Sequence, residues 1–173
     1  AQGGVLSPLI WNLVFDDFVR MINDLPGTRA PTFPDDCLGL VMAENAPLLQ
    51  QLVNRMLRLA DRWTSLVGLQ IKLKKTELVF FGGSNERAPL VFFKDRFLPL
   101  SESVKFLGIT FDKFLSFAGH VTQKINSAKG TLSLLSNLQI SDRGASPQLV
   151  KWAYDTLIRP TFSYGCHVWA HSL

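Results

Sequence analysis

Two adjacent aspartates, Asp35 and Asp36, are the residues whose type and spacing could do chemistry. They lie at an expected chain reversal in the stretch TFPDDCLGLVM (32–42), and the apolar run after them predicts a buried strand. Burying one carboxylate is unfavourable unless it is paired, and a second beside it adds to the penalty. A divalent cation offsets that penalty, because it takes carboxylate oxygens directly and shares them with substrate phosphates. A plain loop is the alternative, since Pro and Asp are ordinary turn residues.

The composition of the whole chain limits the class of protein to which such a site could belong. Its 173 residues are 47% hydrophobic and 18% charged, which is typical of one globular domain and excludes a disordered tail. Cys37 and Cys166 are too far apart in sequence to suggest a disulfide framework, so a reducing compartment is expected. No signal peptide or membrane span is expected either, which predicts an intracellular protein of the nucleus or cytoplasm with no membrane partner.

The charge of the chain is uneven. Residues 1–112 hold equal numbers of basic and acidic residues, so the net charge of +4 lies entirely in residues 113–173. That segment has six basic residues against two acidic ones, the basic ones being Lys113, Lys124, Lys129, Arg143, Lys151 and Arg159. A polyanion would be attracted to this segment, although a solvated helix face remains the alternative.

Turn and capping residues predict the elements that position the aspartates. A helix is expected from Ser7 as N-cap and Pro8 as first helical residue, ending at Pro26-Gly27. A strand is expected over Thr28–Phe33, although Pro31 and Pro34 make it a poor one. Asn45 and Pro47 then begin a second helix, which Gly68 ends.

Alternation of apolar and polar residues predicts strands in the middle of the chain. Residues 69–73 alternate as a half-buried strand, Leu78 to Phe81 form an apolar one, and residues 90–94 with 97–100 suggest a hairpin. A further strand is expected over Val104–Asp112, interrupted by Gly108.

Helical spacing returns in the last third. Apolar residues recur every three or four positions from Ser116, and Ser146-Pro147 begins another helix that Pro160 interrupts. The order of elements predicts an α+β fold with its helices segregated at the C-terminal end.

Taken together, five stretches resemble the reverse transcriptase of non-LTR retrotransposons of the jockey and R1 kind. Ala1 stands where this family usually has Pro, and Lys72-Leu73 replace its Asn-Pro. The five stretches are AQGGVLSPLIWNL (1–13), FPDD (33–36), GLQIKLKKTELVFF (68–81), KFLGITFD (105–112) and SPQLVKWAYDTLIRPTFSYGCHVW (146–169).

The resemblance implies the C-terminal part of a right-hand polymerase. Residues 1–112 would be a palm remnant, an antiparallel sheet with packed helices, and residues 113–173 a helical thumb-like region. The implied activity is that of an RNA-directed DNA polymerase, a nucleotidyltransferase that uses an RNA template, a DNA primer and a dNTP. Two Mg²⁺ ions would stabilise the attacking oxygen and the leaving pyrophosphate.

The resemblance also implies roles for particular residues. Asp35 and Asp36 would bind metal, and Lys75 would donate a proton to the departing pyrophosphate. Gln2 and Gly3 would lie along the nucleotide and template. Phe33 would contact the substrate. The primer grip would consist of Phe106, Leu107 and Gly108. The nucleic-acid backbone would be bound by Lys124, Lys129 and Lys151.

Two departures from the family pattern bear on activity. The family's other metal-binding Asp and its fingers lie N-terminal to the QG segment, and Asp16 and Asp17 do not substitute because their helix follows that segment. Pro34 occupies the turn, and its φ, fixed near −65°, could twist the aspartate pair out of geometry. We therefore expect a fragment or decayed copy that lacks the N-terminal portion of its parent and is inactive alone. A non-catalytic nucleic-acid-binding or protein-interaction remnant is the alternative.

Overall fold

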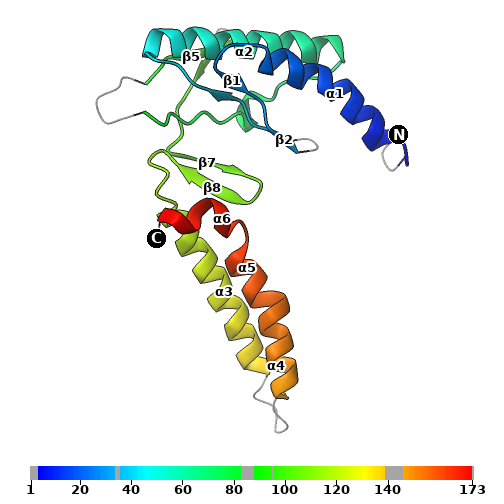
Figure 1. Cartoon of the computed structure of the whole chain (residues 1–173), viewed down its shortest axis with the longest axis vertical. Helices are drawn as coiled ribbons and strands as arrows, with labels where there is room; N and C mark the ends of the chain where they lie inside the picture. The colour runs from blue at the N-terminus through cyan, green and yellow to red at the C-terminus, as the bar shows by residue number, and fades with distance from the viewer. Residues whose placement is uncertain (1–3, 34–35, 83–87, 95, 139–145, 173) are drawn as a thin grey trace. The chain divides into compact units, whose positions relative to one another are not determined.

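The computed structural model describes residues 4–33, 36–82, 88–94, 96–138 and 146–172, apart from the side chains of 136–138. Its contacts divide the chain into two compact units, Ala1–Leu107 and Gly108–Leu173 (Figure 1). The boundary lies at Leu107 rather than at the predicted Asp112. The described residues combine helices with small antiparallel strand pairs, which is compatible with the predicted α+β class.

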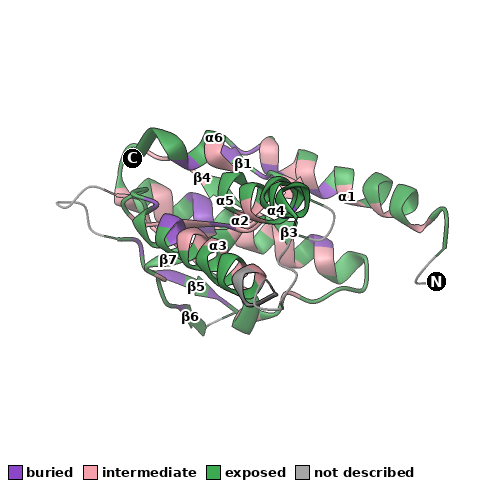
Figure 2. Cartoon of the chain, turned by 90° about the horizontal axis from the view of Figure 1, so that it is seen from below, coloured by how far each residue is buried: buried purple, intermediate pink, exposed green. Residues whose placement is uncertain are grey.

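Two helices form the framework of the first unit. Helix α1 spans Ser7–Asn23 and helix α2 spans Ala46–Leu66. Their shared core contains the buried residues Phe18, Ile22, Ala30 and Trp63, against which Trp11 and Phe15 pack. The first half of α1 is different, because its apolar residues Leu9, Ile10 and Leu13 are exposed, and this end of the helix is mainly green in Figure 2.

The predicted helix ends are only partly right. Asn45 caps α2 by accepting a hydrogen bond from the N–H of Leu48 at 2.9 Å, and Gly68 follows its end with a φ of +74°. At α1 the prediction is wrong: Leu6 is the N-cap and Ser7 is already the first helical residue. The backbone of Leu6 has helical torsion angles, so the helix starts one residue earlier than the Ser-Pro signal indicates.

Strands pair in twos among the described residues of this unit. β1 (Thr28–Arg29) pairs with β4 (Leu40–Val41), and β2 (Thr32–Phe33) pairs with β3 (Asp36–Cys37), both antiparallel. The predicted strand over 28–33 is thus broken near Pro31, which cannot donate a backbone hydrogen bond.

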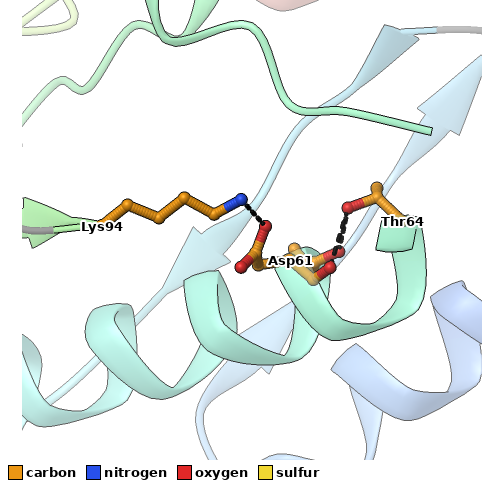
Figure 3. A network of polar contacts seen from close by, with 4 residues as sticks. Asp61, Thr64 and Lys94 are labelled. Atoms are coloured by element: carbon orange, nitrogen blue, oxygen red, sulfur yellow. Dashed lines mark hydrogen bonds and ion pairs between the residues drawn. The ribbon is translucent and has the colours of Figure 1, made fainter. Parts of the chain in front are cut away.

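A second strand pair lies against α2. β5 (Val91–Phe93) and β6 (Arg96–Leu98) form the predicted hairpin and bury Val91, Phe93 and Leu98 with Val53 of α2. An ion pair of 2.7 Å between Lys94 and Asp61 joins this hairpin to α2 (Figure 3).

The predicted strand over residues 69–73 is wrong. This segment is not assigned as a strand and leads into a 3₁₀ turn, η1 (Leu73–Lys75). Alternation alone does not form a strand without a neighbouring strand to pair with. Leu78 makes a single parallel bridge with Leu100, and β7 (Ser103–Phe106) completes the unit.

The second unit is mainly helical. β8 (Ile109–Asp112) leads to α3 (Ala118–Leu138), and Ser146 caps the next helix as predicted, accepting from the N–H of Leu149 at 3.3 Å. Ile109, Phe117, Val121 and Trp169 form its core. The remaining helical segments are α4 (Pro147–Ala153), η2 (Tyr154–Ile158), α5 (Arg159–Ser163), α6 (Cys166–Trp169) and η3 (Ala170–Ser172).

Pro160 does not interrupt the helix as predicted. The chain stays helical from α4 into α5, and η2 is a π-helical turn in which the N–H of Arg159 bonds to the carbonyl of Tyr154. Pro160 has no N–H, and its ring would clash with the carbonyl of Thr156 in a regular α-helix. Widening the preceding turn relieves that clash without ending the helix.

Candidate functional site

Asp36, the second aspartate of the pair, is the first residue of β3 in the β2–β3 hairpin. Phe33 pairs with Asp36 across the hairpin, so the chain does reverse where the sequence predicts. Pro34 and Asp35 lie outside the described residues, as do Gln2 and Gly3. Asp36 is exposed, so its carboxylate does not carry the burial penalty expected from the sequence.

Hydrogen bonds fasten this hairpin to the end of α1. The hydroxyl of Thr28, which is fully buried, donates to the carbonyls of Ile22 and Leu25, and Asn23 Oδ1 accepts from the N–H of Ala30 at 2.9 Å. At the base of the hairpin the N–H of Met42 donates to the Gly27 carbonyl at 2.8 Å. The hairpin is thereby held by its base, and the sequence reasoning missed these residues.

The prediction that a buried strand follows the aspartates is wrong. Cys37, Leu40 and Met42 are exposed, since two paired strands cover each other's edges but leave one face open. Although Cys37 as a residue is exposed, neighbouring atoms desolvate its thiol and raise its pKa to about 11. That thiol therefore stays protonated at neutral pH.

Three residues from three separate motifs line one cavity in the first unit. Asp36 of FPDD, Lys75 of η1 and Phe106 at the end of β7 all contribute to its wall, and its volume is about 540 Å³. The remaining lining is mainly apolar and includes Trp11 and Phe15. Residues from three distant motifs thus line one concave surface. Phe33 is 61% exposed and is not among the lining residues.

The described residues alone do not complete a magnesium site. They contain no group of three or more His, Cys, Asp or Glu side chains that could hold a metal ion. Asp36 offers carboxylate oxygens at the cavity, but Mg²⁺ requires near-octahedral oxygen coordination. Asp36 can therefore contribute to such a site only together with ligands beyond the described residues.

The segment that resembles the primer grip contains a tight turn. Leu107 and Gly108 have φ values of +47° and +78°, and Gly108 interrupts the predicted strand as expected. The predicted backbone-contacting lysines lie on two helices of the second unit, Lys124 and Lys129 on α3 and Lys151 on α4.

Asp112 organises the connection from β8 to α3, and the sequence reasoning assigned it no role. Its carboxylate accepts hydrogen bonds from the backbone N–H groups of Phe114, Ser116 and Phe117 and from the hydroxyl of Ser116, at 2.7–3.1 Å. Leu115 and Phe117 have positive φ values in this turn, which are unfavourable for residues with a side chain. Asp before a predicted helix is the signal that could have found it.

Asp112 should make the second unit sensitive to acid. Desolvation, the largest single influence, raises the pKa of its carboxyl, but the hydrogen bonds from Ser116, Phe117 and Phe114 together outweigh it and hold that pKa below its usual range. A depressed folded-state pKa contributes stability that is present above the unfolded value and is lost as the pH falls through the folded one. We expect Asp112→Asn to destabilise the unit at neutral pH. Below about pH 4 the variant should lose less stability with falling pH than the unchanged chain does. Native-state hydrogen exchange at backbone amides of the second unit, measured at several pH values, reports both effects. Equal acid sensitivity of the two proteins would contradict the assignment.

Comparison with known proteins shows the family. A model of the family described as reverse transcriptase (RNA-dependent DNA polymerase) matches residues 1–111. The chain therefore belongs to the reverse transcriptase family, and the resemblance drawn from the five motifs is confirmed.

The curated relatives are proteins of mobile elements from Drosophila melanogaster. The chain is 28% identical over 168 residues to the putative 115 kDa protein in type-1 retrotransposable element R1DM. It is 27% identical over 180 residues to the probable RNA-directed DNA polymerase from transposon X-element, and 23% identical over 175 residues to the RNA-directed DNA polymerase from mobile element jockey. Each match covers 97% of this chain but only 16–19% of the relative.

No solved structure matches the chain. In the part of the chain that the structure describes, no helix has the length and apolar character needed to cross a membrane.

Proposed function

We propose that this chain is a palm and thumb portion of an RNA-directed DNA polymerase of a non-LTR mobile element. The observation that carries this proposal is the cavity of the first unit. Asp36, Lys75 and Phe106 are separated by 39 and 31 positions in the sequence, and all three line it. They come from the three motifs that, by resemblance, bind metal, donate a proton and hold the primer.

Each of these residues has a chemical part in the proposed reaction. Asp36, together with Asp35, provides carboxylate oxygens for Mg²⁺, which when bound stabilises charge on the attacking and leaving oxygens. Lys75 supplies an ammonium group that can donate a proton to the leaving pyrophosphate. Phe106, at the end of β7, supports the primer end beside Leu107 and Gly108.

The second unit provides the electrostatic attraction for the duplex. Lys124, Lys129 and Lys151 lie on its helices, in the segment that carries the whole net charge of +4. Lysine contacts to phosphates position a duplex without reading its sequence. RNA template and DNA primer are therefore the proposed partners.

A chimeric polymerase tests this function. We would replace the matched segment of the jockey polymerase with this chain and measure dNTP incorporation on an RNA template with a DNA primer and Mg²⁺. The chimera is expected to extend the primer, and Asp36→Asn is expected to lower the rate roughly a hundredfold or more, because a ligand oxygen and its charge are lost. The isolated 173-residue chain is expected to extend nothing.

Glu44→Gln is the matched control in the chimera. Glu44 is also an exposed carboxylate of the first unit, but it does not line the cavity. We expect it to change incorporation by less than about twofold. Equal rates for the two variants, or a folded chimera that binds duplex without extending it, would contradict the polymerase assignment and favour a non-catalytic binding remnant.

A further inference from the structure

Tyr164 is an aromatic residue of the second unit that is 49% exposed. Its carbonyl accepts a hydrogen bond of 3.1 Å from the indole N–H of Trp169, which is only 2% exposed and belongs to the core. Gly165 follows with a φ of +66°, and a Cβ there would lie 2.5 Å from Cδ1 of Ile109. The carbonyl of Tyr164 and the backbone of Gly165 thus both lie against core residues of the second unit.

A lysine lies over the ring of Tyr164. The ammonium nitrogen of Lys124, on α3, is 4.9 Å from the ring centroid. A cation over the face of a tyrosine is attracted by the negative face of the ring, which limits the orientations that the lysine adopts. Of the three lysines proposed to contact nucleic acid, Lys124 is the one with such an aromatic partner among the described residues.

The turn at Gly108 meets the same ring. A Cβ built on Gly108 would lie 3.2 Å from Cε1 of Tyr164, closer than most side chains tolerate. The backbone of this turn therefore approaches the phenol directly, with no side chain in between. A half-exposed ring, a positioned ammonium group and a bare backbone segment lie together within the second unit.

This combination suits one unit of a nucleic-acid strand. Each nucleotide carries a phosphate, which an ammonium group binds, and a sugar and base, whose flat or apolar surfaces stack on aromatic rings. The absence of a side chain at Gly108 lets the backbone of its turn support the phenol ring directly.

We propose that Lys124, Tyr164 and the Gly108 turn form a binding subsite for one nucleotide of the bound strand. Lys124 takes the phosphate, and the exposed part of the Tyr164 ring packs on the sugar or base. This inference rests on the proposed function, because it needs the second unit to bind nucleic acid. It adds a contact that is not electrostatic to a surface otherwise characterised by charge.

The experiment separates the two kinds of contact by their salt dependence. Binding of a fluorescent RNA–DNA hybrid with a single-stranded RNA overhang to the full chain is measured by anisotropy at several salt concentrations. Lys124→Gln should weaken binding and reduce the slope of log affinity against log salt by about one. Tyr164→Leu should weaken binding about tenfold without changing that slope, because stacking releases no counterions. Tyr164→Phe keeps the ring and should bind within about twofold of the unchanged chain.

Tyr154→Leu is the matched control. Tyr154 is 53% exposed on the same unit, and no lysine lies over its ring among the described residues. It should bind like the unchanged chain. Equal affinities for the Tyr164→Leu and Tyr154→Leu variants, with binding otherwise intact, would overturn the subsite but not the proposed function.

A measurement on the unchanged chain removes any dependence on how the variants fold. A hybrid carrying 4-thiouridine should form a photo-crosslink to the peptide that contains Tyr164. A crosslink confined to other peptides would overturn the subsite. Absence of salt-dependent binding by the unchanged chain would overturn the proposed function as well.

Discussion

Changing Lys124, Lys129 and Lys151 together to Glu is expected to abolish binding of an RNA–DNA hybrid, with a loss of roughly a hundredfold or more in affinity. Each reversal removes two units of charge, so the net charge of the chain falls from +4 to −2. The reason is the release of counterions: a protein that neutralises fewer phosphates releases fewer of them and binds less tightly. Anisotropy titrations at three salt concentrations measure both the affinity and its salt dependence.

A triple reversal in the first unit is the matched control. Arg55, Arg58 and Arg62 are exposed on α2, and their change to Glu alters the net charge of the chain by the same amount. We expect this variant to keep most of the affinity, since residues 1–112 are neutral overall. Equal losses for the two variants would mean that net charge alone governs binding and that the second unit is not the binding surface.

Gly27→Ala is expected to destabilise the first unit by about 3 kcal/mol and to loosen the hairpin that carries Asp36. Gly27 has a φ of +70°, and a Cβ there would lie 2.4 Å from the backbone oxygen of Met42. Backbone cannot rotate away as a flexible side chain can, so the strand must shift and the bond from the Met42 N–H to the Gly27 carbonyl is lost. Hydrogen exchange at Leu38 and Met42, together with thermal unfolding followed by circular dichroism, measures the effect.

Gly68→Ala separates the clash from the backbone strain. Gly68 has nearly the same φ, +74°, but a Cβ there would meet nothing within 4 Å. We expect a cost of only about 1 kcal/mol from the left-handed conformation. If both substitutions destabilise the protein equally, the contact with Met42 does not hold the base of the hairpin.

Local signals in the sequence predicted those elements that local interactions determine. Asn45 and Ser146 cap their helices because a side-chain oxygen reaches an N–H three residues on. The hairpin of residues 91–98 forms around a short turn between two apolar runs. The turn at Gly108 follows from the backbone freedom of glycine.

Contacts between residues far apart in the sequence could not be predicted from such local signals. The alternation over residues 69–73 is present, but no strand pairs with it among the described residues, and the segment leads into η1 instead. Asp36, Lys75 and Phe106 could be placed in motifs, yet their meeting at one cavity depends on how α1, α2 and the hairpins pack. Asp112 belongs to a recognised motif, but its hydrogen bonds depend on a turn with two positive φ values that the sequence does not signal.

The π turn at η2 also affects how this region should be aligned and redesigned. A wider turn shifts the angular position of every later residue by about one residue's rotation, roughly 100°. A helical wheel drawn continuously over residues 147–163 therefore assigns Arg159–Ser163 to the wrong side. Residues before and after the turn need separate wheels, and a designer who replaces Pro160 to regularise the helix should delete one residue of η2 to keep the second half in register.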